Sequence, residues 1–204
     1  LNNEKRELLG SRQISFIEKS IESNDAWNLY AQQVLLGSLK LPLIPNEIID
    51  RLPSFQQYLK LVIREDLPFN FDAWDGYPAE RKRLLKAAGS KTQKNIFVAG
   101  DTHNCWVSNI KDEESFRGVE LGTPSVTSPG ASENFAGLIP ATDLEKAVVN
   151  KNKNLKWTNL SNRGYLTINF NPGFADAEFK GVNNIASKDY SCLLYTSDAA
   201  DDET

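Results

Sequence analysis

The segment that most constrains the fold is Asn95–Asn104, in which a short apolar run is followed directly by ionisable side chains. The run Ile96–Ala99 is β-prone and uninterrupted, which predicts a buried strand inside a sheet. Gly100 then lets the backbone turn sharply. Ligands of open α/β sheets bind at the carboxyl ends of the strands. This turn is therefore the first candidate for a functional site.

Two side chains of the turn, Asp101 and His103, suit a metal ion. They lie two residues apart, so both can face one point beyond the sheet edge, and a carboxylate and an imidazole are common metal ligands. His103 is the only histidine of the chain, so any imidazole chemistry must take place here. The alternative is that Asp101–Asn104 forms an Asx-turn or a helix cap and binds no ligand.

Helical and strand patterns alternate upstream, which predicts an α/β fold. Apolar residues at three- and four-residue spacing predict a helix that Ser11 caps and that stops at Ser23–Asp25. Residues 26–36 are typical of a strand. A second helix is expected from Pro78 to Ala88, since proline fits the first helical position.

Residues 37–71 are interrupted by Pro42, Pro45 and Pro53. We expect a surface insertion over the sheet edge, with short helices in 46–51 and 55–64. The pattern assigns this insertion no chemistry.

Between the insertion and the second helix lies Asp72–Arg81. In the functional interpretation, the carboxylate of Asp72 or Asp75 reaches the metal site at Asp101 and His103, and Tyr77 or Arg81 binds an anion. The alternative is ordinary packing of these side chains and a charge on a helix surface.

The carboxy-terminal part is rich in strand patterns. Residues 105–110 and 118–121 predict a hairpin, and 122–130 is a hydroxyl-rich loop that either offers backbone donors to an anion or is only a connection. Thr142 has capping-box spacing to Glu145 for a helix that reaches Asn150. Segments 155–160, 164–170 and 175–182, with turns at 162–164 and 171–173, predict an antiparallel meander that closes the sheet.

The last thirteen residues differ from the rest. Cys192–Asp202 resembles the in-frame translation of a transposase adapter used for sequencing libraries, so we expect 192–204 to be a non-native tail and set it aside from the fold. The chain has no methionine, and we expect it to be part of a longer protein. The four acidic residues of the tail account for the whole formal net charge of −4.

The composition of the chain without this tail argues against several classes of protein. Without the tail the chain is near neutral, which argues against a nucleic-acid-binding surface. No apolar run approaches the roughly 20 residues of a membrane span. Two cysteines make no disulfide framework, and no partner protein is implied.

Several motifs, taken in order, resemble one family. They are Asp72–Arg81, Val98–Asn104, Thr123–Gly130 and Asn162–Tyr165, supported by Leu8–Gly10, Gln13 and Ala31–Val34. In this order, the motifs resemble those of the alkaline phosphatase D (PhoD-like) family, which is part of the calcineurin-like metallophosphoesterase superfamily. The resemblance covers about residues 8–190.

This resemblance implies a two-sheet sandwich flanked by helices, of which residues 1–191 would be the carboxy-terminal part. It implies hydrolysis of phosphate mono- and diesters, in the periplasm or outside the cell, with calcium and iron. Asp101 and His103 would be metal ligands and catalytic residues, because the ions of such sites activate water and bind the phosphoryl oxygens. Asn104 and Asp75 would orient ligands, and Tyr77 and Arg81 would contact substrate.

The chain also departs from the family pattern. The acidic and histidine motifs that supply the other metal ligands in the amino-terminal half of the family do not occur here. We therefore expect the parent enzyme to be a phosphatase or phosphodiesterase and this fragment to be inactive. The alternatives are a non-catalytic binding or structural domain on the same scaffold, and a metal-dependent hydrolase of another ester.

Overall fold

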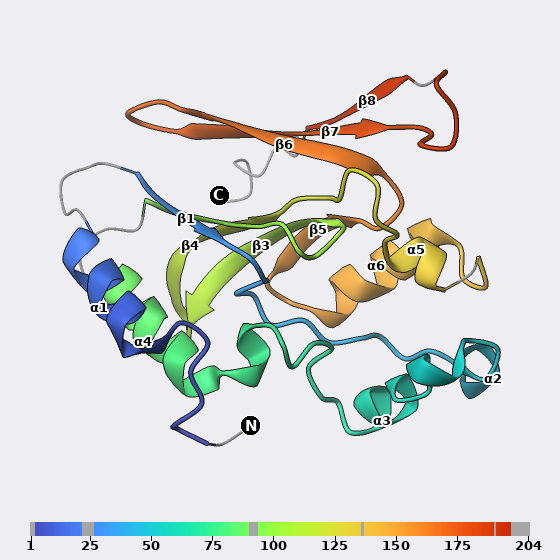
Figure 1. Cartoon of the computed structure of the whole chain (residues 1–204), viewed down its shortest axis with the longest axis horizontal. Helices are drawn as coiled ribbons and strands as arrows, with labels where there is room; N and C mark the ends of the chain where they lie inside the picture. Colours follow the sequence, from blue (N-terminus) through green and yellow to red (C-terminus); the bar gives the residue numbers. More distant parts are fainter. Residues whose placement is uncertain (1–2, 22–26, 90–93, 136, 190, 197–204) are drawn as a thin grey trace.

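The chain forms two stacked β-sheets with helices packed beneath them, as the computed structural model shows (Figure 1). The structure describes residues 3–21, 27–89, 94–135, 137–189 and 191–196. The three-stranded sheet lies on one face of the five-stranded sheet, and helices α1 and α4 lie on the other. The predicted α/β class and the two-sheet sandwich with flanking helices are confirmed.

The five-stranded sheet has the order β1-β2-β4-β3-β5. Strand β2 is parallel to both of its neighbours, and β3 is antiparallel to β4 and β5. The predicted buried strand is therefore an inner strand, one position from the β1 edge. The strands are β1 (Asn28–Gln32), β2 (Asn95–Ala99), β3 (Cys105–Asp112), β4 (Ser115–Gly122) and β5 (Leu155–Asn159).

Successive side chains of β2 serve the two faces of this sheet, as strand geometry requires. Phe97 packs with buried residues of α4 and with Ile110. Ile96 packs on the opposite face with Leu121 and with Phe179 of the second sheet. Because both faces of β2 are covered, its apolar run is continuous rather than alternating.

Helices α1 (Gly10–Ser20) and α4 (Pro78–Ala88) pack against each other. The predicted Ser11 cap of α1 is wrong, because the helix already begins at Gly10. The carboxylate of Glu80, in α4, accepts the backbone N–H groups of Leu9 (3.0 Å) and Gly10 (2.8 Å) instead. A side chain 70 residues away thus satisfies the helix start. The expected stop at 23–25 lies outside the described residues.

The insertion between β1 and α4 has short helices within the two predicted ranges, 46–51 and 55–64. It contains α2 (Asn46–Ile49), the 3-10 turn Ser54–Gln56, α3 (Leu59–Arg64) and the 3-10 turn Trp74–Gly76. Leu41, Ile49 and Val62 belong to one buried apolar cluster with Leu144 and Val148 of helix α6 (Ala141–Lys151). A short helix, α5 (Ala131–Asn134), precedes α6 in the chain.

The predicted capping box at the start of α6 is wrong. Pro140 is the N-cap residue, and the helix has no side-chain cap. The carboxylate of Glu145 accepts the N–H of Leu160 at 2.8 Å, so a tertiary contact takes the place of the local one.

The expected single meander is also wrong. Strand β5 joins the first sheet, whereas β6 (Arg163–Phe170), β7 (Ala175–Val182) and β8 (Cys192–Thr196) form the second. Asn159 Oδ1 accepts the N–H groups of Ser161 (3.3 Å) and Asn162 (2.9 Å), which turns the chain out of the first sheet. Arg163, expected in a turn, therefore begins the strand, one residue before the predicted start at Gly164.

The expected non-native tail begins with a paired strand. Cys192–Thr196 runs antiparallel to β7, with Val182 opposite Cys192. Strand pairing uses main-chain groups that every sequence has, so this pairing does not test the origin of the segment. Residues 197–204 lie outside the described part.

Within the described ranges, no helix combines the length and apolarity that crossing a bilayer requires.

Candidate functional site

The predicted turn after β2 lies beside the segment that follows β1. Asp101 donates its backbone N–H to the carbonyl of Gln33 at 2.9 Å, and its carboxylate accepts Gln33 Nε2 at 3.3 Å. Since β1 and β2 are parallel, their carboxyl ends meet at one sheet edge. The structure thus places Asp101 at the edge where the sequence predicts it.

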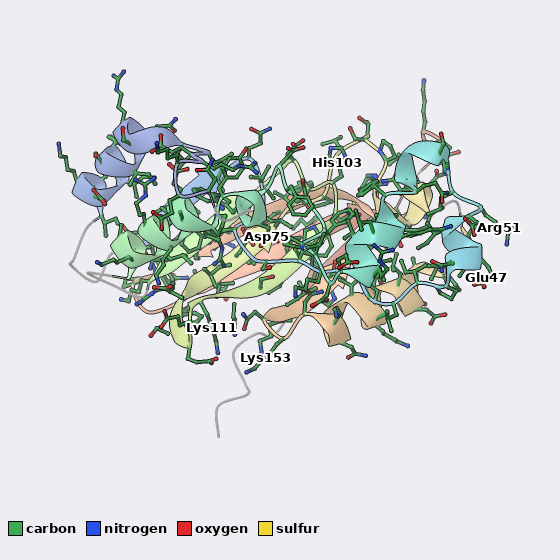
Figure 2. All side chains as sticks on the ribbon, turned by 90° about the horizontal axis from the view of Figure 1, so that it is seen from below. Glu47, Arg51, Asp75, His103, Lys111 and Lys153 are labelled. Carbon is green, nitrogen blue, oxygen red and sulfur yellow. The ribbon has the colours of Figure 1, made fainter. Side chains whose placement is uncertain are left out.

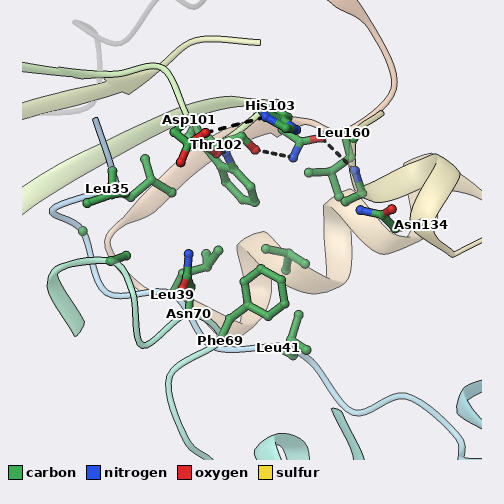
Figure 3. A pocket seen from close by; sticks show the side chains of 18 of the residues that line it. Leu35, Leu39, Leu41, Phe69, Asn70, Asp101, Thr102, His103, Asn134 and Leu160 are labelled. Carbon is green, nitrogen blue, oxygen red and sulfur yellow. Dashed lines mark hydrogen bonds and ion pairs between the residues drawn. The ribbon is translucent and has the colours of Figure 1, made fainter. Parts of the chain in front are cut away.

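The backbone and the side chain of His103 are both constrained. Its φ is 59°, in the left-handed region that few non-glycine residues adopt. Nδ1 lies 3.0 Å from the carbonyl oxygen of Pro129. Because a carbonyl oxygen only accepts, Nδ1 carries a hydrogen in this contact, and in the neutral imidazole Nε2 is then the nitrogen with the lone pair. Nε2 lies 3.8 Å from Oδ1 of Asp101 (Figure 3).

The side chain of Asn104 stabilises this turn through hydrogen bonds. It is buried, its amide donates to the carbonyl of Thr102 at 2.9 Å, and its Oδ1 accepts the N–H of Ala131 at 3.1 Å. The indole N–H of Trp106 donates to the Thr102 hydroxyl. These contacts join the turn to the start of α5 and suit the orienting role predicted for Asn104.

Glu133 and Arg163 support the Pro129–Gly130 turn that receives His103. Glu133 accepts the N–H of Gly130 at 3.0 Å and also binds the guanidinium of Arg163, which is only 2% exposed. Burial raises the pKa of Glu133, but its hydrogen bonds outweigh that effect, and the net pKa is lowered. A path of contacts therefore runs from Arg163 through Glu133 to the Pro129 carbonyl.

Gly130 has no room for a larger residue. A Cβ there would lie 2.5 Å from Asn104 Oδ1 and 3.0 Å from the Arg163 guanidinium. Arg163 was expected in a turn motif, and no role was predicted for Glu133. Their pairing across 30 residues had no local signal.

A buried carboxylate, Glu120 in β4, holds the segment after β1. It accepts the N–H groups of Leu36 (2.5 Å) and Gly37 (2.8 Å), and it is 1% exposed. Burial raises the pKa of Glu120 to about 7, against the lowering effect of these N–H groups and of Arg81. Sequence reasoning missed Glu120, although an acid inside a strand covered on both faces is itself a signal.

Asp75 and Arg81 belong to the same buried group. Asp75 accepts the N–H of Leu39 at 3.0 Å, and burial raises its pKa. Arg81 donates from Nε to the carbonyl of Leu36 at 2.7 Å, and burial lowers its pKa. Both therefore position the segment after β1, and Asp75 also lines the pocket described below.

The other residues predicted for this site lie away from the Asp101–His103 turn. The ring of Tyr77 is covered by the guanidinium of Arg6, 4.7 Å from the ring centroid. Neither Tyr77 nor Arg81 lines the pocket, and Asp72 is exposed outside it. Figure 2 shows Lys111 and Lys153 on the opposite side of the molecule from His103. The predicted substrate contacts of Tyr77 and Arg81 remain predictions.

A cavity of about 200 Å³ lies beside the turn (Figure 3). Asp101, Thr102, His103 and Asn104 contribute one part of its lining. The insertion to which the sequence assigned no chemistry contributes another. Its lining there consists of Gly37, Leu39, Leu41, Phe69 and Asn70.

Asp101 and His103 fit one metal ion as a pair. Metal–ligand distances of about 2.0–2.2 Å keep two ligands of one ion within about 4.4 Å, and the observed separation is 3.8 Å. A ligating histidine usually donates its other N–H to a carbonyl, as His103 does to Pro129. No group of three or more potential His, Cys, Asp or Glu ligands occurs among the residues that the structure describes.

Comparisons with known proteins give a consistent result. The PhoD-like phosphatase profile matches residues 1–179. Alkaline phosphatase D of Bacillus subtilis (strain 168) is 28% identical over 185 residues, which are 87% of this chain and 27% of that protein. A solved structure described as the structure of PhoD has 24% identity and a TM-score of 0.70, over 95% of this chain and 34% of that one.

A more distant match is the probable DNA-binding protein SNT1 of Saccharomyces cerevisiae (strain ATCC 204508 / S288c). It is 23% identical over 158 residues, which are 76% of this chain and 13% of that protein. The chain thus spans at most about a third of the relatives it matches. Because the family profile covers most of the chain, this protein belongs to the PhoD-like phosphatase family.

Proposed function

We propose that this chain supplies part of the metal site of a phosphoesterase that hydrolyses phosphate mono- or diesters. The observation that carries the proposal is the orientation of the His103 ring. Its Nδ1 is hydrogen-bonded to the Pro129 carbonyl, and its Nε2 faces the Asp101 carboxylate. The proposal is supported by the proximity of this carboxylate and this imidazole in the lining of one cavity.

The family membership supports the choice of reaction. Calcium and iron are the proposed metals, since a carboxylate suits a hard cation and an imidazole suits iron. A bound ion would polarise the phosphoryl oxygens and activate water. Asp101 and His103 would hold the ion, and Asn104 would keep their turn in place. Asp75 would act less directly, by holding the segment after β1.

Two ligands do not complete a two-metal site. We propose that the remaining ligands belong to a longer protein, that this chain alone does not turn over substrate, and that the longer protein acts outside the cytoplasm. The test is to recover the reading frame on both sides and assay the longer protein with p-nitrophenyl phosphate and bis(p-nitrophenyl) phosphate. Asp101→Ala should abolish turnover, whereas exposed Asp176→Ala should not change it.

A second measurement needs no turnover. The imidazole signals of the single histidine are unambiguous in an NMR spectrum, so calcium and iron(III) can be titrated into this chain directly. We expect His103 to shift or broaden with iron in wild type and to respond less in Asp101→Ala. A longer protein without further acidic and histidine ligands, together with no His103 response, would favour the non-catalytic scaffold instead.

A further inference from the structure

The cavity beside His103 has two chemically different parts. Asp101, Thr102 and His103 lie at one side of it, whereas Leu39, Leu41 and Phe69 lie across from them (Figure 3). The apolar part continues through α6 and the chain after β5. Its members there are Leu144 and Val148 of α6 and Leu160 after β5, and Phe135 at the end of α5 adjoins them.

The apolar part is built into the core and does not consist of loosely attached surface groups. Leu144, Val148 and Leu160 are at most 3% exposed, and all three belong to one packed cluster with Leu41 and Phe135. Buried side chains in a dense core keep their rotamers. The shape of this wall is therefore set before any ligand binds.

Few polar side chains line the cavity apart from those of the Asp101–Asn104 turn. Asn70, Asp75 and Asn134 also line the cavity, but the Asp75 carboxylate already accepts the Leu39 N–H. A hydroxyl or charged group placed against the leucine and phenylalanine side chains would lose its hydration without compensation. An apolar group would gain by leaving water.

The volume sets the size of the group. An apolar cavity of about 150 Å³ binds benzene, and this cavity measures about 200 Å³. It therefore accommodates one aromatic ring or a short alkyl chain.

We propose that this cavity is a subsite for the apolar group of an aryl or alkyl phosphoester, adjoining the point faced by Asp101 and His103. The phosphoryl group would lie at the polar rim, and the organic group would extend over Leu39 and Phe69 towards Leu160. The phosphoryl part of this inference rests on the proposed function, whereas the apolar part rests on the cavity alone.

The test measures binding to this chain by NMR, from the indole signal of Trp106, which lines the cavity, and the imidazole of His103. Phenyl phosphate, methyl phosphate and benzyl alcohol are titrated separately, with calcium present. We expect phenyl phosphate to bind at least about tenfold more tightly than methyl phosphate. A tenfold difference is about 1.4 kcal/mol and corresponds to burying about 60 Å² of apolar surface.

A matched pair of variants locates the effect. Leu39→Gln places a polar group in the cavity wall, while Leu43→Gln alters a leucine of the same segment that is 88% exposed and not in the lining. We expect Leu39→Gln to weaken the binding of phenyl phosphate about fivefold or more and to change the affinity for methyl phosphate by less than about twofold. Leu43→Gln should change neither affinity.

The outcomes separate the two proposals. Equal affinities of phenyl and methyl phosphate for the wild-type chain would overturn the subsite, whether or not Leu39→Gln folds. Binding of methyl phosphate at His103 without a gain from the ring would leave the proposed function standing. Benzyl alcohol binding with no response to either phosphate would retain the apolar site and overturn its link to phosphoesters.

Discussion

The support of His103 by Glu133 and Arg163 can be tested by removing the carboxylate with Glu133→Ala. In the native structure this carboxylate accepts Arg163 Nη2, the Gly130 N–H at 3.0 Å and the Ser132 hydroxyl at 2.9 Å. After the substitution, the hydrogen bonds that remain to the buried guanidinium from the described part of the chain go to the carbonyls of Ser161 (3.3 Å) and Asn162 (3.2 Å). Its Nε has no partner in the described residues.

The expected cost follows from burial. Removing one partner of a fully buried ion pair costs about 3–5 kcal/mol. The Glu133 side chain is 47% exposed, so water replaces part of the loss, and a hydrogen bond to a charged group is worth about 1.5–3 kcal/mol. We therefore expect a loss of about 2–3 kcal/mol in the free energy of unfolding. For a chain of this size the midpoint temperature should fall by about 4–12 °C.

The assay is urea and thermal unfolding followed by tryptophan fluorescence, with Glu114→Ala as control. Glu114 is 88% exposed and lies 3.9 Å from Lys111, so its removal should change stability by less than about 0.5 kcal/mol. Glu133→Gln should lie between Glu133→Ala and wild type, because the amide oxygen still accepts one N–H.

A second readout separates positioning of His103 from general stability. The ¹⁵N spectrum of the single histidine at alkaline pH should show the Nδ1–H tautomer in wild type and a mixture of tautomers in Glu133→Ala. The reasoning is refuted if Glu133→Ala costs no more than Glu114→Ala and leaves the tautomer unchanged.

Three further predictions concern other buried groups. Gly130→Ala should lower the free energy of unfolding by about 1–3 kcal/mol, because the added Cβ clashes with buried neighbours. Gly173→Ala, with open space around it, should lower it by less than about 0.5 kcal/mol. Equal losses for the two variants in urea unfolding would contradict this prediction. Folding raises the pKa of Glu120 from 4.5 to about 7, so the folded state favours the protonated acid. Relative to Glu120→Gln, wild type should lose about 3 kcal/mol of stability as the pH rises from 4.5 to 7, and a pH-independent difference would refute this sign. Cys105 is 2% exposed, and burial raises its pKa to about 12, so a thiol reagent should label Cys192 in the native chain and both thiols only after unfolding.

Local patterns were sufficient for several elements of the fold. The apolar run before Gly100 predicted β2, and Pro78 predicted the first residue of α4. These features depend on residues close in sequence, namely on strand propensity and on the fixed φ of proline. They could be read without knowing what packs against them.

Capping and sheet membership were predicted less well, because partners distant in sequence replaced local ones. Ser11 and Thr142 have the right spacing for caps, but Glu80 satisfies the start of α1, and α6 begins after Pro140. The strand patterns after residue 155 were real, but a pattern of alternation does not say which sheet a strand joins. The Asn159 turn decided that.

By itself the sequence determined the α/β class, the family and the turn that carries Asp101 and His103, because each depends on patterns and motifs that are read directly along the chain. Only the tertiary structure decided how that turn is held and what adjoins it. The Glu120 carboxylate accepts the N–H groups of Leu36 and Gly37, more than 80 residues away, and Glu133 pairs with Arg163, 30 residues away. The cavity wall combines Leu39, Phe69 and Leu160, and no short-range pattern brings side chains so far apart in the chain to one point.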